Sequence, residues 1–199
     1  MKVVKDLSEV DRIDFVVLTG DGKWEFRVLK GLESRIRCDL VIFFPESPLA
    51  KKTGKSVYKA IPVYVSKYKI CKFLVILDRE HHKSFDEDLR ILKNINVKVS
   101  NHCELIKDRV LHISGKLGSH DVIIYTCIQG NMRLNDEIKK LIEAQFSVKL
   151  KSDDHGVIRK FLESKNLDIT ELIKTANPKN LGYLTIYLAL KEICKNIKE

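Results

Sequence analysis

The sequence predicts an α/β fold with a mainly parallel sheet flanked by helices. Apolar runs of strand length alternate along the chain with segments whose apolar residues recur at helical spacing. The runs at 13–19, 38–44 and 73–77 are apolar almost throughout, which is typical of strands buried on both faces of a parallel sheet. The last quarter of the chain shows only helical spacing. We therefore expect an α/β domain over residues 1–150 and a helical C-terminal extension, residues 151–199, packed on it.

The elements of the first half follow in order from local signals. After the first strand, two glycines mark a turn, and the next helix carries an apolar residue at every fourth position from Trp24 to Ile36. After the second strand, a Gly-Lys-Ser turn leads into a short helix, which Pro62 is expected to interrupt. Ser84 follows the third strand and is a suitable N-cap for the next helix.

The second half is expected to hold three shorter strands and four helices. The strands are expected at 96–99, 109–114 and 121–127, and the helices at 133–145, 155–164, 168–175 and 179–197. Pro178 is expected in the first turn of the last helix, where a missing backbone donor costs nothing.

Charge is the main global feature of the composition. The 199 residues carry a formal net charge of +9, and 32% of them are charged, against about 25% in an average protein. Such a balance favours polyanionic partners, with nucleic acid, DNA or RNA, as the first candidate. The alternative is a lysine-rich surface without a specific partner.

Cysteine usage and hydropathy indicate the setting. The five cysteines are scattered and include no CxxC pair, which argues against a disulfide framework and against a zinc ribbon: Cys38, Cys71, Cys103, Cys127 and Cys194. The chain shows neither a signal peptide nor an apolar run of membrane-spanning length. We expect a cytoplasmic protein without membrane segments.

The stretch CKFLVILDREHH, residues 71–82, carries the first candidate site. Its apolar run ends at Asp78 and Glu80, two carboxylates separated by one residue. Sites in parallel sheets form at the carboxyl ends of strands, and Mg²⁺ prefers oxygen ligands. The pair therefore predicts a site for Mg²⁺ or Mn²⁺, although it also suits a strand that simply leaves the core. Of His81 and His82 at most one is expected to face the site, and a surface position is the default for both.

A second candidate is the basic segment KKTGKSVYKAIPVYVSKYKICK, residues 51–72. It holds seven lysines, no acid and three tyrosines, Tyr58, Tyr64 and Tyr68. Lysines neutralise phosphates and tyrosine rings stack on exposed bases, although a solvated helix with inward tyrosines fits the same pattern. The residues predicted to contact nucleic acid are Lys51, Lys52, Lys55, Lys59 and Arg79.

Two nucleotide-binding motifs are incomplete. Gly20-x-Gly22 follows a strand as in a dinucleotide fold, but Glu25 occupies the third glycine position. Gly54-Lys55-Ser56 is similar to the end of a P-loop, but Leu49 occupies its first glycine position. A P-loop-like nucleotide-binding protein is kept as an alternative.

The order of motifs over residues 13–145 resembles the TOPRIM domain of topoisomerases, primases and related nucleases. VLTGDGKWEFRVLKGL is similar to that family's first strand, turn and helix, and KKTGKSVYKAI to the segment before its third strand. FLVILDRE is similar to the strand with its acid pair, and QGNMRLNDEI places Glu137 at a later acidic position.

This resemblance implies a Mg²⁺-dependent nuclease or phosphotransferase that acts on nucleic acid. Asp78 and Glu80 would then bind the metal, and Glu137 would be catalytic. Thr19 occupies the position of the family's general acid or base, and only Asp21 or Glu25 is near enough to replace it. We therefore expect cleavage to be slow or absent. The alternative is a degenerate module that binds nucleic acid or a partner without catalysis.

Overall fold

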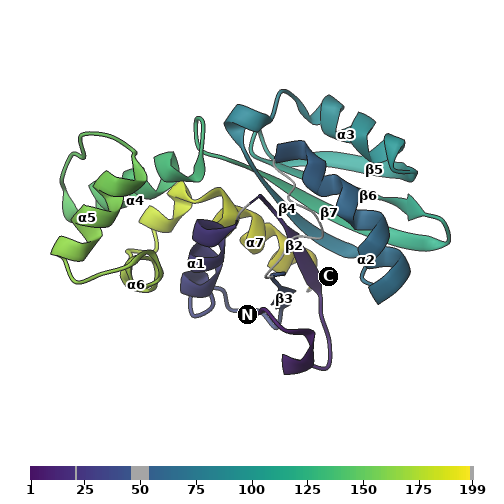
Figure 1. Ribbon diagram of the computed structural model, residues 1–199, viewed down its shortest axis with the longest axis horizontal. Helices are drawn as coiled ribbons and strands as arrows, with labels where there is room; N and C mark the ends of the chain where they lie inside the picture. The colour runs from purple at the N-terminus through teal and green to yellow at the C-terminus, as the bar shows by residue number, and fades with distance from the viewer. Residues whose placement is uncertain (21, 46–53, 198–199) are drawn as a thin grey trace.

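The computed structural model describes residues 1–20, 22–45 and 54–197. Within them, one seven-stranded sheet carries helices on both faces (Figure 1). The strands are β1 (Lys2–Val4), β2 (Phe15–Leu18), β3 (Val41–Phe43), β4 (Lys72–Asp78), β5 (Val97–Ile106), β6 (Val110–Leu117) and β7 (His120–Gln129). The α-helices are α1 (Lys23–Leu32), α2 (Ile61–Tyr68), α3 (Phe85–Asn94), α4 (Leu134–Phe146), α5 (His155–Ser164), α6 (Ile169–Thr175) and α7 (Thr185–Asn196). Short 3₁₀ segments are η1 (Leu7–Glu9), η2 (Gly54–Ala60), η3 (Arg79–His81) and η4 (Asn180–Tyr183).

The strand order is β1-β3-β2-β4-β7-β6-β5. The first five strands in that order pair in parallel, and β7, β6 and β5 pair antiparallel. The three strands predicted at 13–19, 38–44 and 73–77 correspond to β2, β3 and β4, which are neighbours and parallel. The prediction of a mainly parallel sheet flanked by helices is therefore confirmed.

Strand β4 is buried on both faces because it lies at the middle of the sheet. Leu74 and Ile76 belong to the core cluster that also contains α1, α4, α5, α6 and α7. Phe73, Val75 and Leu77 belong to the opposite cluster, which contains η2, α2 and α3. This alternation gives the continuous apolar run that the sequence shows, since both side-chain directions end in a core.

The connections from β2 and β3 reverse the strand order. From β2 the chain passes through α1 to β3 on one side, and from β3 it reaches β4 on the other side of β2. Because α1, which follows β2, and α3, which follows β4, pack on opposite faces, the loops at the carboxyl ends of β2 and β4 diverge. Such a reversal is where open α/β sheets bind their ligands.

The last helices pack against the sheet and against α1. Helix α6 contacts α1, and α7 contacts both α1 and β7. Their buried residues belong to the same cluster as those of β2 and β4. A boundary at residue 150 stays a prediction. None of the helices described is long and apolar enough to cross a membrane.

Three local expectations need correction. Pro62 does not interrupt the helix that follows the Gly-Lys-Ser turn, because it lies in the first turn of α2, where its missing donor is harmless. Pro178 precedes η4 rather than starting the last helix. The strands expected at 96–99, 109–114 and 121–127 are longer, because they form a meander at the sheet edge.

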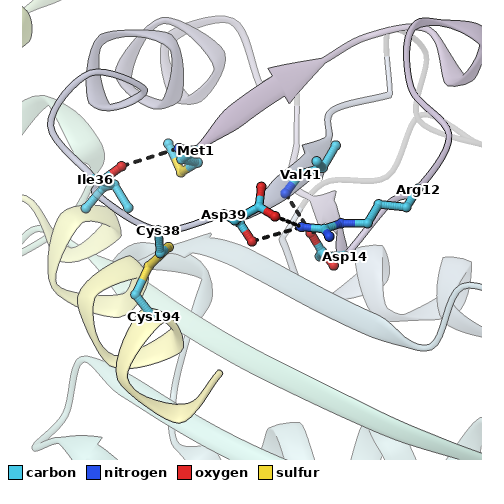
Figure 2. The surroundings of a disulfide bond; sticks show 8 residues. All are labelled: Met1, Arg12, Asp14, Ile36, Cys38, Asp39, Val41 and Cys194. Carbon is cyan, nitrogen blue, oxygen red and sulfur yellow. Dashed lines mark hydrogen bonds and ion pairs between the residues drawn. A yellow bond between two sulfur atoms is a disulfide. The ribbon is translucent and has the colours of Figure 1, made fainter. Parts of the chain in front are cut away.

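The expectation of unpaired cysteines also needs correction. Cys38, at the entry to β3, forms a disulfide with Cys194 in α7, across a sequence separation of 156 residues (Figure 2). Beside it, Asp14 accepts a hydrogen bond from the backbone N–H of Val41 (2.7 Å), and Arg12 pairs with Asp39 (2.7 Å). Cys71, Cys103 and Cys127 are free thiols. Spacing alone could not show the pair, because its members come from opposite ends of the chain.

Loss of the disulfide is expected to lower stability substantially. Closing a loop of this length removes conformational entropy from the unfolded chain, worth about 5 kcal/mol in the chain-entropy description. We expect Cys38→Ala with Cys194→Ala to lower the free energy of unfolding by about 3–5 kcal/mol in denaturant titrations without reductant. Cys103→Ala, which removes an exposed free thiol, is the matched control. Equal stability of the double variant and the unmodified protein would contradict the pairing.

Candidate functional site at the carboxyl ends of β2 and β4

A cavity of about 450 Å³ opens where the strand order reverses. Its walls come from the end of β2 with the first turn of α1, the start of η2, the end of β4 with η3, the start of α4 and the start of α5. The lining residues are Thr19, Gly20, Lys23, Trp24, Glu25, Gly54, Ile76, Leu77, Asp78, His81, Arg133, Leu134, Asn135 and His155. Five segments that are distant in the sequence thus meet at one edge of the sheet.

The turn after β2 depends on one of its two glycines. Gly22 is the N-cap of α1 and has a φ of +68°, a conformation that favours glycine. A Cβ there would lie 2.7 Å from Cζ of Phe44, whereas a Cβ on Gly20 would meet no atom within 4 Å. The Gly-x-Gly pattern therefore reflects helix capping and close packing at Gly22. It needs no dinucleotide to explain it.

Asp78 ends β4 and lines the cavity while half-buried. The backbone N–H of Leu134 donates to its Oδ1 (3.0 Å), so the carboxylate caps the first turn of α4. Burial raises the pKa of Asp78 above its ordinary value, and the hydrogen bond from Leu134 offsets part of that rise. The charged form of Asp78 faces the cavity, and its partial burial costs the folded state free energy.

Glu80 is oriented by a cation of the chain itself. Its Oε2 lies 3.0 Å from Nε of Arg133, and its Oε1 lies 3.5 Å from Nε2 of His81. Glu80 does not line the cavity beside Asp78. Across the described ranges, no three His, Cys, Asp or Glu side chains are grouped as a metal would require. The predicted acid pair is thus divided between the cavity and an ion pair on its rim.

The other predicted catalytic residues lie in different places. Glu25 and Thr19 line the cavity. Asp21 lies outside the described residues. Glu137, expected at the active centre, does not line the cavity and is only 1% exposed. The structure therefore brings Asp78 and Glu25 together but not Glu137.

Glu137 is surrounded by donors from its own chain. Gly130 and Thr185 donate their backbone N–H groups to it (2.8 and 2.9 Å), the Thr185 hydroxyl also binds it, and Arg109 forms an ion pair with it (3.0 Å). These contacts join the start of α4 to the start of α7 and to the turn before β6. They favour a structural role for Glu137, contrary to the catalytic role expected from the sequence.

Three of the predicted nucleic-acid contacts, Lys55, Lys59 and Arg79, lie within the described residues. Lys55 is largely buried and pairs with Glu87 of α3, and Arg79 donates to the carbonyl oxygen of Asp108. Lys59 is exposed on η2. Lys51 and Lys52 lie outside the described residues. The pairing of Lys55 also argues against a P-loop role, in which that lysine would reach a bound phosphate.

Two further expectations for this region are wrong. Tyr58 and Tyr64 are buried and unavailable for stacking on bases, since the Tyr58 hydroxyl bonds Thr126 inside the core (2.8 Å). His82 is not a surface residue: its Nε2 lies 2.9 Å from Oδ2 of Asp88, and both side chains are buried. Burial raises the pKa of Asp88, and the bond to His82 opposes that rise.

The aromatic wall of the cavity was not predicted from the sequence. Trp24 of α1 and His155 of α5 stack with ring centroids 4.0 Å apart and planes inclined by 32°. Beyond them lies a groove of about 530 Å³ between α1, α5 and α6, whose lining includes Arg27, Ile158 and Leu162. Trp24 was assigned to the apolar stripe of its helix, and no site role was predicted for His155. Neither position gave a sequence signal, because 131 residue numbers separate them.

Comparisons with protein-family models, with curated proteins and with solved structures found no match to this chain. The resemblance to the TOPRIM domain therefore remains an expectation from the motifs.

The raised pKa of Asp78 predicts how stability depends on pH. A carboxyl group whose pKa rises on folding favours the protonated folded state, so its stabilising effect is complete below the unfolded pKa and is lost as pH rises through the folded pKa. Asparagine removes this loss and can still accept from Leu134. We expect Asp78→Asn to raise the melting temperature at pH 7 and to leave it unchanged near pH 3. A lower melting temperature at pH 7 would contradict the account of Asp78.

The contacts of Glu137 predict a large loss of stability on neutralisation. Glu137→Gln turns one acceptor oxygen of a buried side chain into a donor and takes the ionic partner from Arg109, whose side chain is about one third exposed, so we expect a cost of about 2–3 kcal/mol. The matched control is Glu171→Gln, which removes an exposed ion pair with Lys174 and should cost less than about 0.5 kcal/mol. If urea titrations showed the same small loss in the free energy of unfolding for both variants, the structural role of Glu137 would be contradicted and a catalytic role would again be a candidate.

Proposed function

We propose that this protein binds nucleic acid by taking a phosphorylated nucleotide unit into the cavity between β2 and β4, with cleavage slow or absent. The observation that carries the proposal is the position and lining of this cavity. It lies at the strand-order reversal, and cations and an aromatic ring converge there from separate segments.

Charge supports an anionic ligand. The chain carries a formal net charge of +9, which raises the local concentration of polyanions and speeds their encounter. Lys23 and Arg133 are the cations of the cavity lining. Arg133 is more than half exposed although it pairs with Glu80, so one guanidinium edge can meet a phosphate without breaking the fold.

The aromatic wall supports a nucleotide rather than a simple phosphate. Trp24 and His155 form part of both the cavity and the adjoining groove. A base that stacks on an aromatic side chain gains about 1–3 kcal/mol without regard to its sequence. The apolar floor of the groove, with Ile158 and Leu162, suits the edge of such a base. A base in the groove would leave its phosphate at the cavity.

The residues present do not fit a resident Mg²⁺. Arg133 already neutralises Glu80, and of the two carboxylates that line the cavity, Asp78 is committed to Leu134 through one oxygen. Across the described residues, no three His, Cys, Asp or Glu side chains are grouped to hold a metal. Mg²⁺ in proteins is usually held by one or two carboxylates together with ligand phosphates. A resident cation is therefore not part of the proposal.

The proton-transfer groups also favour binding over cleavage. Thr19 lines the cavity where the related family carries a glutamate, and Glu137 is buried elsewhere. Proton transfer typically contributes about 10²–10⁴-fold to such reactions. Glu25 lines the cavity and is the candidate that remains for proton transfer among the described residues. The proposal therefore assigns the site to recognition of nucleic acid, the non-catalytic alternative to the nuclease.

A free nucleotide is the second candidate ligand, and the size of the site favours it. The cavity of about 450 Å³ falls within the usual range of small-molecule sites, about 300–1,000 Å³. A strand end and a free nucleotide share the same chemistry, a phosphate beside a base. The affinities of the protein for an oligonucleotide and for a free nucleotide decide which of the two is the ligand.

Binding can be followed through the only tryptophan of the chain. We expect a 5′-phosphorylated oligothymidylate to quench the fluorescence of Trp24, because a stacked base would lie against its ring. The same oligonucleotide without the phosphate should bind more weakly, and thymidine monophosphate tests the free-nucleotide alternative. Saturable binding of labelled oligonucleotide without any change in Trp24 fluorescence would place the ligand elsewhere.

Neutralising Asp78 separates metal-free recognition from metal-dependent binding. Without a cation the carboxylate repels the phosphate, so Asp78→Asn should tighten oligonucleotide binding by about threefold to tenfold in EDTA. If Asp78 instead held a Mg²⁺ ion that contacts the phosphate, the same change would remove a metal ligand and weaken binding in the presence of Mg²⁺. Anisotropy titrations in EDTA and in Mg²⁺ show whether the variant binds the oligonucleotide more tightly or more weakly than the unmodified protein. Weaker binding of the variant, dependent on Mg²⁺, would contradict the proposal and support the metal site predicted from the sequence.

A further inference from the structure

A groove of about 790 Å³ lies between α3 and the edge strand β5 and shares no lining residue with the cavity. Figure 1 shows α3 alongside β5 at the upper right of the molecule, and the two elements are in contact. The groove is lined by Leu89, Arg90, Lys93, Asn96, Val97, Lys98, Val99, Ser100 and His102.

The strand in this groove has one unpaired side. β5 is the last strand of the sheet order and pairs with β6 on its inner side. From Val97 to Val99 the pairing is regular, and a register shift follows before Asn101. The regular stretch is the part that lines the groove. An edge of this kind can accept a further strand through its outward backbone groups, with a helix beside it to hold alternate side chains.

The charges of the groove favour a negatively charged ligand. Among the residues that the structure describes, three cations line it, Arg90, Lys93 and Lys98, and no acidic residue does. All three are exposed. Two copies of the chain paired through β5 would bring these same cations together, which disfavours a second copy as the occupant.

The remaining lining favours a peptide over nucleic acid. Leu89, Val97 and Val99 give the groove an aliphatic floor, and no phenylalanine, tyrosine or tryptophan lines it. Single-stranded nucleic acid usually needs aromatic rings for base stacking, whereas aliphatic side chains of an extended peptide pack well on such a floor. We propose that this groove binds an extended acidic peptide segment of a partner protein, which adds to β5 as an outer strand.

The test uses a labelled eight-residue peptide of alternating glutamate and valine, measured by fluorescence anisotropy with the full chain. Arg90→Glu with Lys98→Glu should weaken its binding by about tenfold or more, because attraction is replaced by repulsion. Lys160→Glu with Lys165→Glu, which reverses two exposed cations outside the groove, is the control for net charge and should change affinity less than about twofold. The alternating lysine–valine peptide should not bind.

A backbone-modified peptide separates strand addition from charge attraction alone. N-methylation of every second residue keeps the charges but blocks main-chain pairing, and it should abolish binding. Three results would overturn the proposal: equal binding of the N-methylated peptide, equal affinity of the Arg90/Lys98 variant and its control, or tighter competition by oligothymidylate than by the acidic peptide. Circular dichroism of both double variants verifies that the compared proteins are folded.

Discussion

The parallel pairing of β2 with β4 is the constraint on which the rest of the molecule depends. Val16, Val17 and Leu18 pair with Phe73, Leu74 and Val75 at the centre of the sheet. Both strands are buried on two faces. Because they are parallel, their carboxyl ends leave the core at the same edge of the sheet, where the chain meets water. Their connections leave to opposite faces of the sheet, so among the described residues neither connection crosses from one strand end to the other. The cavity is the consequence.

The chain fills part of this edge with its own charges. The carboxylate of Asp78 caps α4, which places a negative group where the first-turn N–H groups of a helix would otherwise attract an anion. Arg133, at the N-cap of the same helix, returns a positive charge and holds Glu80. Under the proposed function, the balance between Asp78 and Arg133 would set how well a phosphate is accepted. This balance argues for recognition of a nucleotide more than for a fixed metal centre.

Much of the sheet could be predicted because its signals are local. The apolar runs of β2, β3 and β4 and the cap at Ser84 follow from neighbouring residues. The site was predictable only at Asp78 and Glu25, which lie at the ends of predicted elements. The stacking of Trp24 on His155, the pairing of Cys38 with Cys194 and the burial of His82 against Asp88 depend on tertiary packing. No spacing in the sequence encodes such contacts.

The lysine-rich segment, residues 51–72, shows how packing can override a role suggested by composition. The lysine-rich segment was predicted as the contact surface, but Lys55 is engaged by Glu87, and Tyr58 and Tyr64 are interior. A helix that covers one face of a sheet must bury its aromatic residues, and this requirement overrides the role that composition suggests. The exposed cations that remain are distributed over several elements.

The position of the ligand is the central claim, and backbone amide chemical shifts test it most directly. Titration of the ¹⁵N-labelled protein with a 5′-phosphorylated dinucleotide should shift the amides of Gly20, Lys23, Asp78 and Asn135, together with the indole N–H of Trp24. These groups line one cavity although they come from three separate segments of the chain. Shifts confined to η2 and α2, or to the groove between α3 and β5, would contradict the assignment of this cavity as the binding site.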